Sequence, residues 1–154
     1  MNPMPSLKRI LLAEDNLRDI QLTLAALEEH HLANEVMVVR DGAEALDYLY
    51  RRGPFSIRTS GHPLVVFLDL KMPKVDGVEV LRRIKGDPEL QMIPVVMVTS
   101  SREQQDVLKS YKLGANAYVV KPIDFQQFND AIKQLGLFWA VLNEPPPGSV
   151  RKTA

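Results

Sequence analysis

Short runs of apolar residues alternate along the chain with longer segments in which apolar residues recur every three or four positions. The runs are typical of strands buried on both faces of a parallel sheet, and the longer segments are typical of amphipathic helices. Five such pairs follow one another, and their runs lie at 8–13, 36–39, 64–68, 95–98 and 117–120. This alternation predicts an α/β domain in which five helices flank five parallel strands.

Local signals place the helices between these runs. Asn16 and Asp41 precede helical segments and are predicted N-caps. The loop at 51–62 is long for an α/β unit. The first helix is expected to bury the face made by Leu17, Ile20, Leu24 and Leu27.

Polar residues close four of the five apolar runs. Glu14 and Asp15 follow the first run, Asp69 the third, Thr99 the fourth and Lys121 the fifth. Because the working residues of open α/β sheets lie just beyond the carboxyl ends of the strands, we expect these side chains to converge on one rim. Three carboxylates, a hydroxyl and an ammonium suit a divalent cation and a phosphoryl group.

The acidic residues predict a magnesium site, since Mg²⁺ takes oxygen ligands and binds only one or two protein carboxylates directly. Asp15 and Asp69 are the expected direct ligands. Glu14 is expected to reach the ion through water, because adjacent residues of a strand point to opposite faces. The backbone carbonyl of Lys71 is a further candidate ligand.

A carboxylate beside a divalent cation can attack phosphorus, because the metal screens the charge of the incoming phosphoryl group. Asp69 is the best candidate for this nucleophile. Lys121 would pair with the phosphoryl oxygens, and Thr99 would donate a hydrogen bond to them. Taken singly, these residues read as a helix cap, a surface lysine and a turn; their combination at four strand ends favours the functional interpretation.

Composition limits the function classes. The 154-residue chain has 19 basic and 19 acidic residues, so no global field would draw it to nucleic acid or to an anionic membrane. It has no cysteine for disulfides or thiol chemistry. No apolar stretch is long enough to span a bilayer, and the start lacks the features of a signal peptide. A cytoplasmic protein is therefore expected.

The motifs at the strand ends resemble those of receiver domains, the phosphoacceptor modules of response regulators in two-component signalling. The matching segments are Glu14-Asp15-Asn16, Asp69-Leu70-Lys71-Met72-Pro73 with Asp76-Gly77, Thr99-Ser100 and Lys121-Pro122. This resemblance implies a flavodoxin-like fold with strand order 2-1-3-4-5. It implies that Asp69 takes phosphate from a sensor histidine kinase in the presence of Mg²⁺, without enzymatic turnover beyond self-phosphorylation and self-dephosphorylation.

The resemblance also implies a switch. In such domains an active-site hydroxyl acts with an aromatic residue three positions before the lysine, and here these are Thr99 and Tyr118. Movement of the tyrosine ring would change a surface made by the fourth helix, fifth strand and fifth helix, and the signal would pass through protein contacts or onward phosphotransfer. An ordinary strand tyrosine is the alternative. The Lys121-Pro122 bond is commonly cis in this family.

Two other functions compete with the phosphoacceptor. One is a phosphorylation-independent interaction module on a degenerate receiver fold, for which loss of the acceptor, lysine or acid pair would be expected. The other is a phosphatase or phosphotransferase with an aspartyl nucleophile, in which a second aspartate two positions later commonly serves as acid and base. Lys71 occupies that position.

Three regions are predicted: an N-terminal tail at 1–6, a receiver domain at 7–136 and an extension at 137–154 that ends in a Pro-rich disordered tail. Residues 137–142 are apolar around most of a helix. The inner stripe is expected to comprise Phe125, Phe128, Ile132, Leu135, Trp139 and Leu142.

The outer side of the extension predicts a homodimer, because its apolar residues have no partner within the domain. The predicted dimer or partner residues are Leu137, Phe138, Trp139 and Val141. The alternative is an extension that folds back over its own domain. The ending is similar to the tail of small response regulators that pair with bacterial phytochrome histidine kinases, which implies a kinase of that type.

Overall fold

The computed structural model describes residues 8–59 and 61–150. Five parallel strands form one sheet in the order β2-β1-β3-β4-β5, which confirms the predicted flavodoxin-like α/β fold. The strands are β1 (Ile10–Ala13), β2 (Val36–Val39), β3 (Val65–Leu68), β4 (Val95–Thr99) and β5 (Ala117–Val120).

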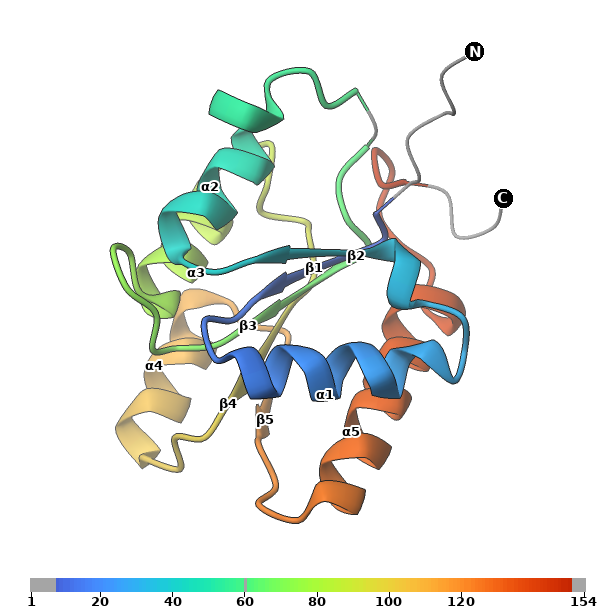
Figure 1. Cartoon of the computed structure of the whole chain (residues 1–154). Helices are drawn as coiled ribbons and strands as arrows, with labels where there is room; N and C mark the ends of the chain where they lie inside the picture. Colours follow the sequence, from blue (N-terminus) through green and yellow to red (C-terminus); the bar gives the residue numbers. More distant parts are fainter. Residues whose placement is uncertain (1–7, 60, 151–154) are drawn as a thin grey trace.

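Helices cover both faces of the sheet (Figure 1). The first and last helices, α1 (Leu17–Glu28) and α5 (Phe125–Leu137), pack against each other on one face. The other face is covered by α2 (Gly42–Tyr50), α3 (Gly77–Gly86) and α4 (Gln104–Leu113). Three short helical turns complete the described secondary structure: η1 (Ala33–Glu35), η2 (Gly53–Phe55) and η3 (Phe138–Leu142).

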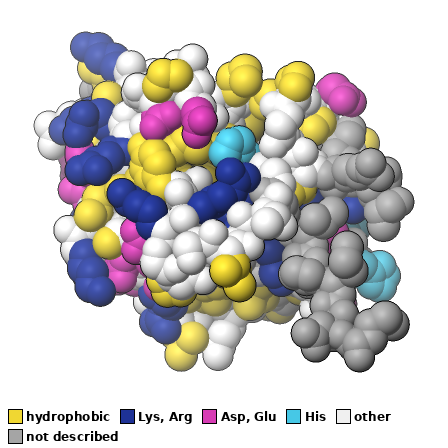
Figure 2. All heavy atoms as spheres, turned by 90° about the horizontal axis from the view of Figure 1, so that it is seen from above, with side chains coloured by type: hydrophobic (Ala, Val, Ile, Leu, Met, Phe, Trp, Pro, Cys, Tyr) yellow, Lys and Arg dark blue, Asp and Glu magenta, His cyan; other side chains and the backbone are white. Residues whose placement is uncertain are grey.

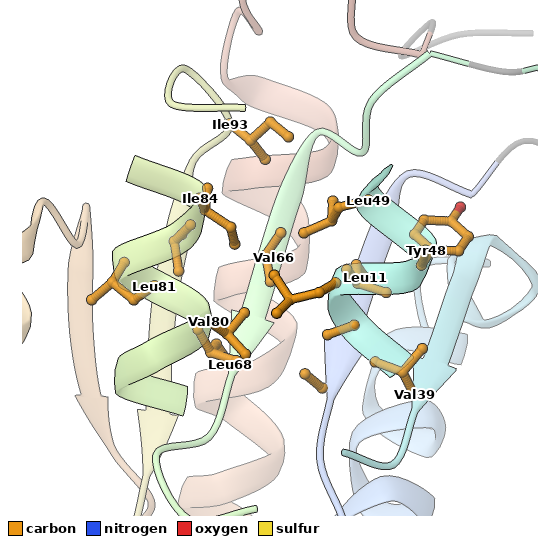
Figure 3. Packing of buried hydrophobic residues seen from close by; sticks show 14 of the residues in the cluster. Leu11, Val39, Tyr48, Leu49, Val66, Leu68, Val80, Leu81, Ile84 and Ile93 are labelled. Carbon is orange, nitrogen blue, oxygen red and sulfur yellow. The ribbon is translucent and has the colours of Figure 1, made fainter. Parts of the chain in front are cut away.

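The central strands are buried on both sides because their alternate residues enter two separate cores. Leu11, Val66 and Met97 belong to the core beneath α2 and α3. Figure 3 shows strand residues of this core meeting Leu49 and Ile84 from the two helices. The neighbouring residues in the strands pack instead beneath α1 and α5. The continuous apolar runs of the sequence therefore reflect a two-sided burial.

The buried face of α1 differs at its start from the predicted face. Leu17 is 56% exposed, because it begins the helix at the rim, beyond the strands on which it was expected to pack. Leu24 is only partly buried. The fully covered positions are Ile20, Thr23, Ala26 and Leu27.

The stripe predicted for α5 is wrong at both ends, where Phe125 is 57% and Leu142 is 64% exposed. The buried positions are spaced four apart at Phe128, Ile132, Gly136 and Ala140. The helix then continues as the π-helical turn η3, in which the Asn143 N–H donates to the Phe138 carbonyl five residues earlier. This wider turn changes which side chains face the domain.

The Pro-rich segment is held against the loop that precedes β3. The His62 N–H donates to the Gly148 carbonyl at 3.0 Å, and the Val150 N–H donates to the His62 carbonyl at 2.9 Å. Val150 is buried. The disorder predicted for the tail is thus wrong up to residue 150, because these backbone groups and this side chain find partners. The predicted tail at 1–6 and residues 151–154 lie outside the described residues, and the domain boundaries stay a prediction.

The long loop at 51–62 is fixed to the end of α2 by Arg58. Its guanidinium lies 4.4 Å from the centre of the Tyr48 ring and donates to the Tyr48 and Gly61 carbonyls. On the face seen in Figure 2, Lys and Arg side chains are interspersed with acidic and hydrophobic ones, so no single charge dominates there. No helix within the described ranges has the length and hydrophobicity needed to cross a membrane.

Candidate functional site

The backbone of the sheet carries the polar residues to one rim. The Asp69 N–H donates to the Ala13 carbonyl at 3.1 Å, so the chain continues the ladder between β1 and β3 by one residue. The Lys121 N–H likewise donates to the Thr99 carbonyl at 2.7 Å beyond β5. Each side chain is therefore positioned by rigid strands rather than by a free loop.

Gly77 allows the start of α3 to lie against the backbone of Asp69. A Cβ atom at position 77 would lie 2.0 Å from the Asp69 carbonyl oxygen, which a real side chain does not permit. The Gly77 N–H donates to the Leu70 carbonyl at 2.8 Å. The Asp76 side chain caps the helix by accepting from the Glu79 N–H. The predicted Asp76-Gly77 motif thus fixes the segment that follows Asp69.

The ammonium of Lys121 lies among three carboxylates. Its Nζ donates to Glu14 Oε1 at 2.6 Å, to Asp69 Oδ2 at 2.8 Å and to Asp19 Oδ2 at 2.8 Å. The side chains of Lys121, Glu14 and Asp69 are nearly covered. Charge-assisted hydrogen bonds of this kind are strong and directional, so the lysine and the two predicted acids form one compact group.

Burial and neighbouring charges shift the pKa values of this group. The pKa of Glu14 is raised to about 7, because desolvation by burial and the negative charge of Asp69 together outweigh the lowering effect of the hydrogen bond from Lys121. Burial alone would lower the pKa of Lys121, but hydrogen bonds to Asp19, Asp69 and Glu14 outweigh this effect and raise it. Lys121 therefore stays charged, whereas Glu14 can carry a proton near neutral pH.

The three acids predicted to form a metal site come together. Glu14, Asp15 and Asp69 each offer one carboxylate oxygen, and these oxygens all lie within 4.8 Å of one another. Such a set of hard oxygen ligands fits a divalent cation. A cation would also stabilise the ionised form of Glu14, which burial and the charge of Asp69 disfavour. The Lys71 N–H donates to Asp69 Oδ1 at 3.3 Å. That the Lys71 carbonyl is a metal ligand stays a prediction.

The loop after β4 links the two predicted switch residues. Thr99 is buried, and its Oγ1 accepts from the Ser101 N–H at 3.4 Å. The Tyr118 hydroxyl donates to the Ser101 carbonyl at 3.0 Å. Thr99 and Tyr118 therefore both contact the backbone of Ser101. The described residues contain no cis peptide bond, so the expected cis form of Lys121-Pro122 is not found.

Asp19 is a site residue that the strand-end pattern did not predict. It lies in the first turn of α1, and its backbone N–H donates to the side chain of the N-cap Asn16 at 3.0 Å. A usable signal was present, since Asp19 follows Asp15 by four residues at the start of a helix. That spacing directs a side chain back toward the residues that precede the helix.

The fold and the site together define a class of protein. A parallel sheet in the order 2-1-3-4-5 carries an acid pair, an acceptor aspartate, a hydroxyl and a lysine at its carboxyl rim, as phosphoacceptor domains of two-component signalling do. The model of the response regulator receiver domain family matches residues 10–133, and the chain belongs to this family. Phosphorylation on aspartate by a histidine kinase is the mechanism of the family.

Individual relatives agree with this assignment. Response regulator Rcp1 of Synechocystis sp. is 36% identical over 132 residues, which are 86% of this chain and 88% of Rcp1. The solved bacteriophytochrome response regulator RtBRR is 63% identical, with a TM-score of 0.72 and coverage of 94% of this chain and 87% of RtBRR.

Two further structures resemble the chain more closely in shape. The phosphorylated cyanobacterial phytochrome response regulator RcpA has a TM-score of 0.84 at 39% identity, covering 92% of this chain and 99% of RcpA. The Mn²⁺-bound form of Rcp1 has a TM-score of 0.83 at 34% identity, covering 90% and 99%. Together with the acidic cluster, the latter structure supports a divalent cation at the rim.

Proposed function

We propose that this response regulator accepts a phosphoryl group on Asp69, with Mg²⁺ at the acidic cluster, from a sensor histidine kinase of the phytochrome type. The observation that carries the proposal is the position of the Asp69 carboxylate. It lies 2.8 Å from the Lys121 ammonium and belongs to the group of acidic oxygens that fall within 4.8 Å of one another.

In the proposed transfer, an Asp69 oxygen forms a bond to phosphorus while the phosphorus–nitrogen bond of the kinase phosphohistidine breaks. The imidazole leaves with the electron pair of that bond. Lys121 binds the phosphoryl oxygens, and the Thr99 hydroxyl donates to them as charge moves onto the group. Asp15, Asp69 and the Lys71 carbonyl would hold Mg²⁺ directly and Glu14 would hold it through water, and the ion would supply positive charge that stabilises the transferring phosphoryl group.

The proposed output is a change in the surface made by α4, β5 and α5. A Thr99 hydroxyl drawn toward the phosphoryl group would change the loop on which the Tyr118 hydroxyl rests, through the Ser101 contacts. The signal then passes by protein contacts or by onward phosphotransfer. The protein turns over no separate substrate, and its own chemistry is limited to gaining and losing the phosphoryl group.

A phosphorylation-independent interaction module is the alternative, and the complete site argues against it. The acceptor, the lysine and the acid pair are present and in contact or close proximity. A lone scaffold has no need of a buried lysine among three carboxylates, since such groups are costly to bury. Lys71 likewise disfavours an aspartyl phosphatase that needs a second aspartate at its position.

A homodimer through the extension is part of the proposal. Phe138 is 48% and Val141 is 40% exposed on the outer side of η3, whereas Leu137 is partly buried. Trp139 packs partly against the core beneath α1 and α5, and its ring meets Phe138 edge to face at 5.0 Å. Trp139 would thus hold the Phe138 ring in place from the side of the core. We place the protein in the cytoplasm, which suits a chain without cysteine. We expect protein partners rather than nucleic acid or a membrane, because 19 basic and 19 acidic residues balance.

Phosphotransfer from a purified phytochrome-type histidine kinase tests the proposed pairing. The kinase is first labelled with radioactive phosphate and then mixed with the wild type or with Asp69→Asn. Transfer of label to the wild type alone, faster than from an unrelated histidine kinase, is the expected result. Equal transfer from both kinases would refute the phytochrome pairing, and label on Asp69→Asn would refute Asp69 as the acceptor.

A further inference from the structure

Lys121 donates all its hydrogen bonds to three carboxylates, of which two belong to the acidic cluster and one does not. A lysine ammonium has three donors and no acceptor, and here each donor has its own carboxylate. Glu14 and Asp69 belong to the acidic cluster with Asp15. Asp19 does not belong to that cluster.

The proposed chemistry would draw two of these carboxylates away from the lysine. A cation at the acidic cluster competes for the oxygens of Glu14 and Asp69, and the phosphoryl group bonds to an oxygen of Asp69. Only the contact between Lys121 Nζ and Asp19 Oδ2, at 2.8 Å, is left unaffected by either event. The backbone of Asp19 is also fixed, because it lies in the first turn of α1 and its N–H donates to the Asn16 side chain.

We propose that Asp19 is a positioning residue that holds the Lys121 ammonium at the phosphoryl site while Glu14 and Asp69 turn to the cation and the phosphoryl group. This inference rests on the proposed function. Lysine is a point charge on a flexible four-carbon stem, so an ammonium without a fixed partner samples many positions. A lysine fixed from the side of α1 stabilises the charge that develops during transfer without first having to be ordered.

Three variants separate the hydrogen bond of Asp19 from its charge. Asp19→Ala removes both, whereas Asp19→Asn removes the charge but keeps an oxygen that accepts from Lys121. Glu28→Ala is the matched control, because it removes an exposed acid at the other end of the same helix. Phosphorylation of each protein by acetyl phosphate with Mg²⁺ gives a maximal rate constant and a KM for the donor. In that reaction an Asp69 oxygen bonds to phosphorus while the bond between phosphorus and the acetate oxygen breaks, and acetate leaves with the electron pair of the broken bond.

Asp19→Ala is expected to lower the maximal rate constant about tenfold, the size of one hydrogen bond to a charged group, with little change in KM. Asp19→Asn is expected to recover most of that loss, and Glu28→Ala to match the wild type. Equal maximal rate constants for Asp19→Ala and the wild type would overturn the inference. So would equal losses in Asp19→Ala and Asp19→Asn, which would mean that only the charge matters.

Hydrogen exchange of the Lys121 ammonium provides a readout that needs no phosphorylation. NMR of the protein saturated with Mg²⁺, in which the cation engages Glu14 and Asp69, detects this group, and Lys121→Arg assigns its signal by removing it. Exchange is expected to be several-fold faster in Asp19→Ala than in the wild type and in Glu28→Ala. Unchanged exchange would overturn the anchoring of Lys121, even if the rates differed. A wild type that takes no phosphoryl group would instead refute the proposed function.

Discussion

At the scale of single residues, one lysine is the shared hydrogen-bond donor of three acids at the rim. Lys121 donates to Glu14, Asp19 and Asp69, and the hydrogen bonds raise its own pKa against the effect of burial. The pKa of Glu14 is nevertheless raised, first because its carboxylate is desolvated by burial and second because Asp69 adds negative charge nearby. Binding of a cation at the acidic cluster would favour the ionised form of Glu14 and so release its proton.

The pKa of Glu14 predicts a pH-dependent cost to stability in the metal-free protein. Its folded value of about 7 lies above the ordinary 4.5, so the native state favours the protonated form and the contribution of Glu14 falls as the pH rises through this interval. Glu14→Gln keeps the shape but cannot ionise. The melting temperature of this variant, relative to the wild type, is therefore expected to rise between pH 5 and pH 8.

Glu28→Gln serves as the control for that comparison, because Glu28 is exposed on the same helix. Its difference from the wild type is expected to be independent of pH. A difference between Glu14→Gln and the wild type that stays constant from pH 5 to pH 8 would contradict the raised pKa.

Most residues of the site were predictable because a parallel sheet brings the ends of its strands to one edge. This rule was sufficient to predict that Glu14, Asp69 and Lys121 lie together, as the contacts confirm. The strand-end rule did not predict Asp19, because the position of this residue depends on how α1 is rotated about its axis. That rotation is set by packing against the sheet and α5, which no strand-end rule contains.

At the scale of elements, the strands were predicted more accurately than the buried faces of α1 and α5. The apolar runs predicted all five strands: the central strands β1, β3 and β4 are buried on both faces, and the edge strands β2 and β5, although only partly buried, are also apolar. The helix faces were predicted less well: Leu17, Phe125 and Leu142 are exposed. Periodicity assumes an ideal α-helix that is covered along its whole length, whereas α1 starts at the rim and α5 ends in a π-helical turn.

Gly136 allows the close approach of α1 and α5, since a Cβ atom there would lie 2.3 Å from Leu27 Cδ2. Leu27 is fully buried and has little room to move. Gly136→Ala is therefore expected to lower the free energy of unfolding by about 1–3 kcal/mol, the usual cost of overpacking a core. Urea denaturation measures the change.

The exposed Gly86 offers a matched control, because a Cβ atom there meets nothing within 4 Å. Gly86→Ala is expected to leave stability unchanged or slightly raised, since alanine favours the helix. A Gly136→Ala variant as stable as the wild type would show that α1 and α5 have room to separate.

At the scale of the whole molecule, the proposed function assigns different roles to two parts of the surface. The rim carries the phosphoacceptor chemistry, while the outer side of η3 exposes apolar residues at the far end of α5. The extension itself stays close to the domain, as the contacts of His62 with Gly148 and Val150 show. An apolar surface carried on an ordered element is well suited to self-association.

Light scattering tests the proposed dimer. The wild type is expected to be dimeric at micromolar concentrations, and Phe138→Asp is expected to be monomeric because it places a charge on the exposed apolar surface. Ile57→Asp is the control, since Ile57 is also exposed but lies on the loop before β3. A dimeric Phe138→Asp would contradict an interface at the extension, and a monomeric wild type would contradict the dimer itself.

The most direct test of the central claim is the intact mass of the protein after treatment with acetyl phosphate and Mg²⁺. The wild type and Asp69→Asn are measured side by side, with circular dichroism to establish that both are folded. The account predicts an added mass of one phosphoryl group on the wild type and none on the variant. The same mass for treated and untreated wild type, with the fold intact, would contradict it and favour a phosphorylation-independent module.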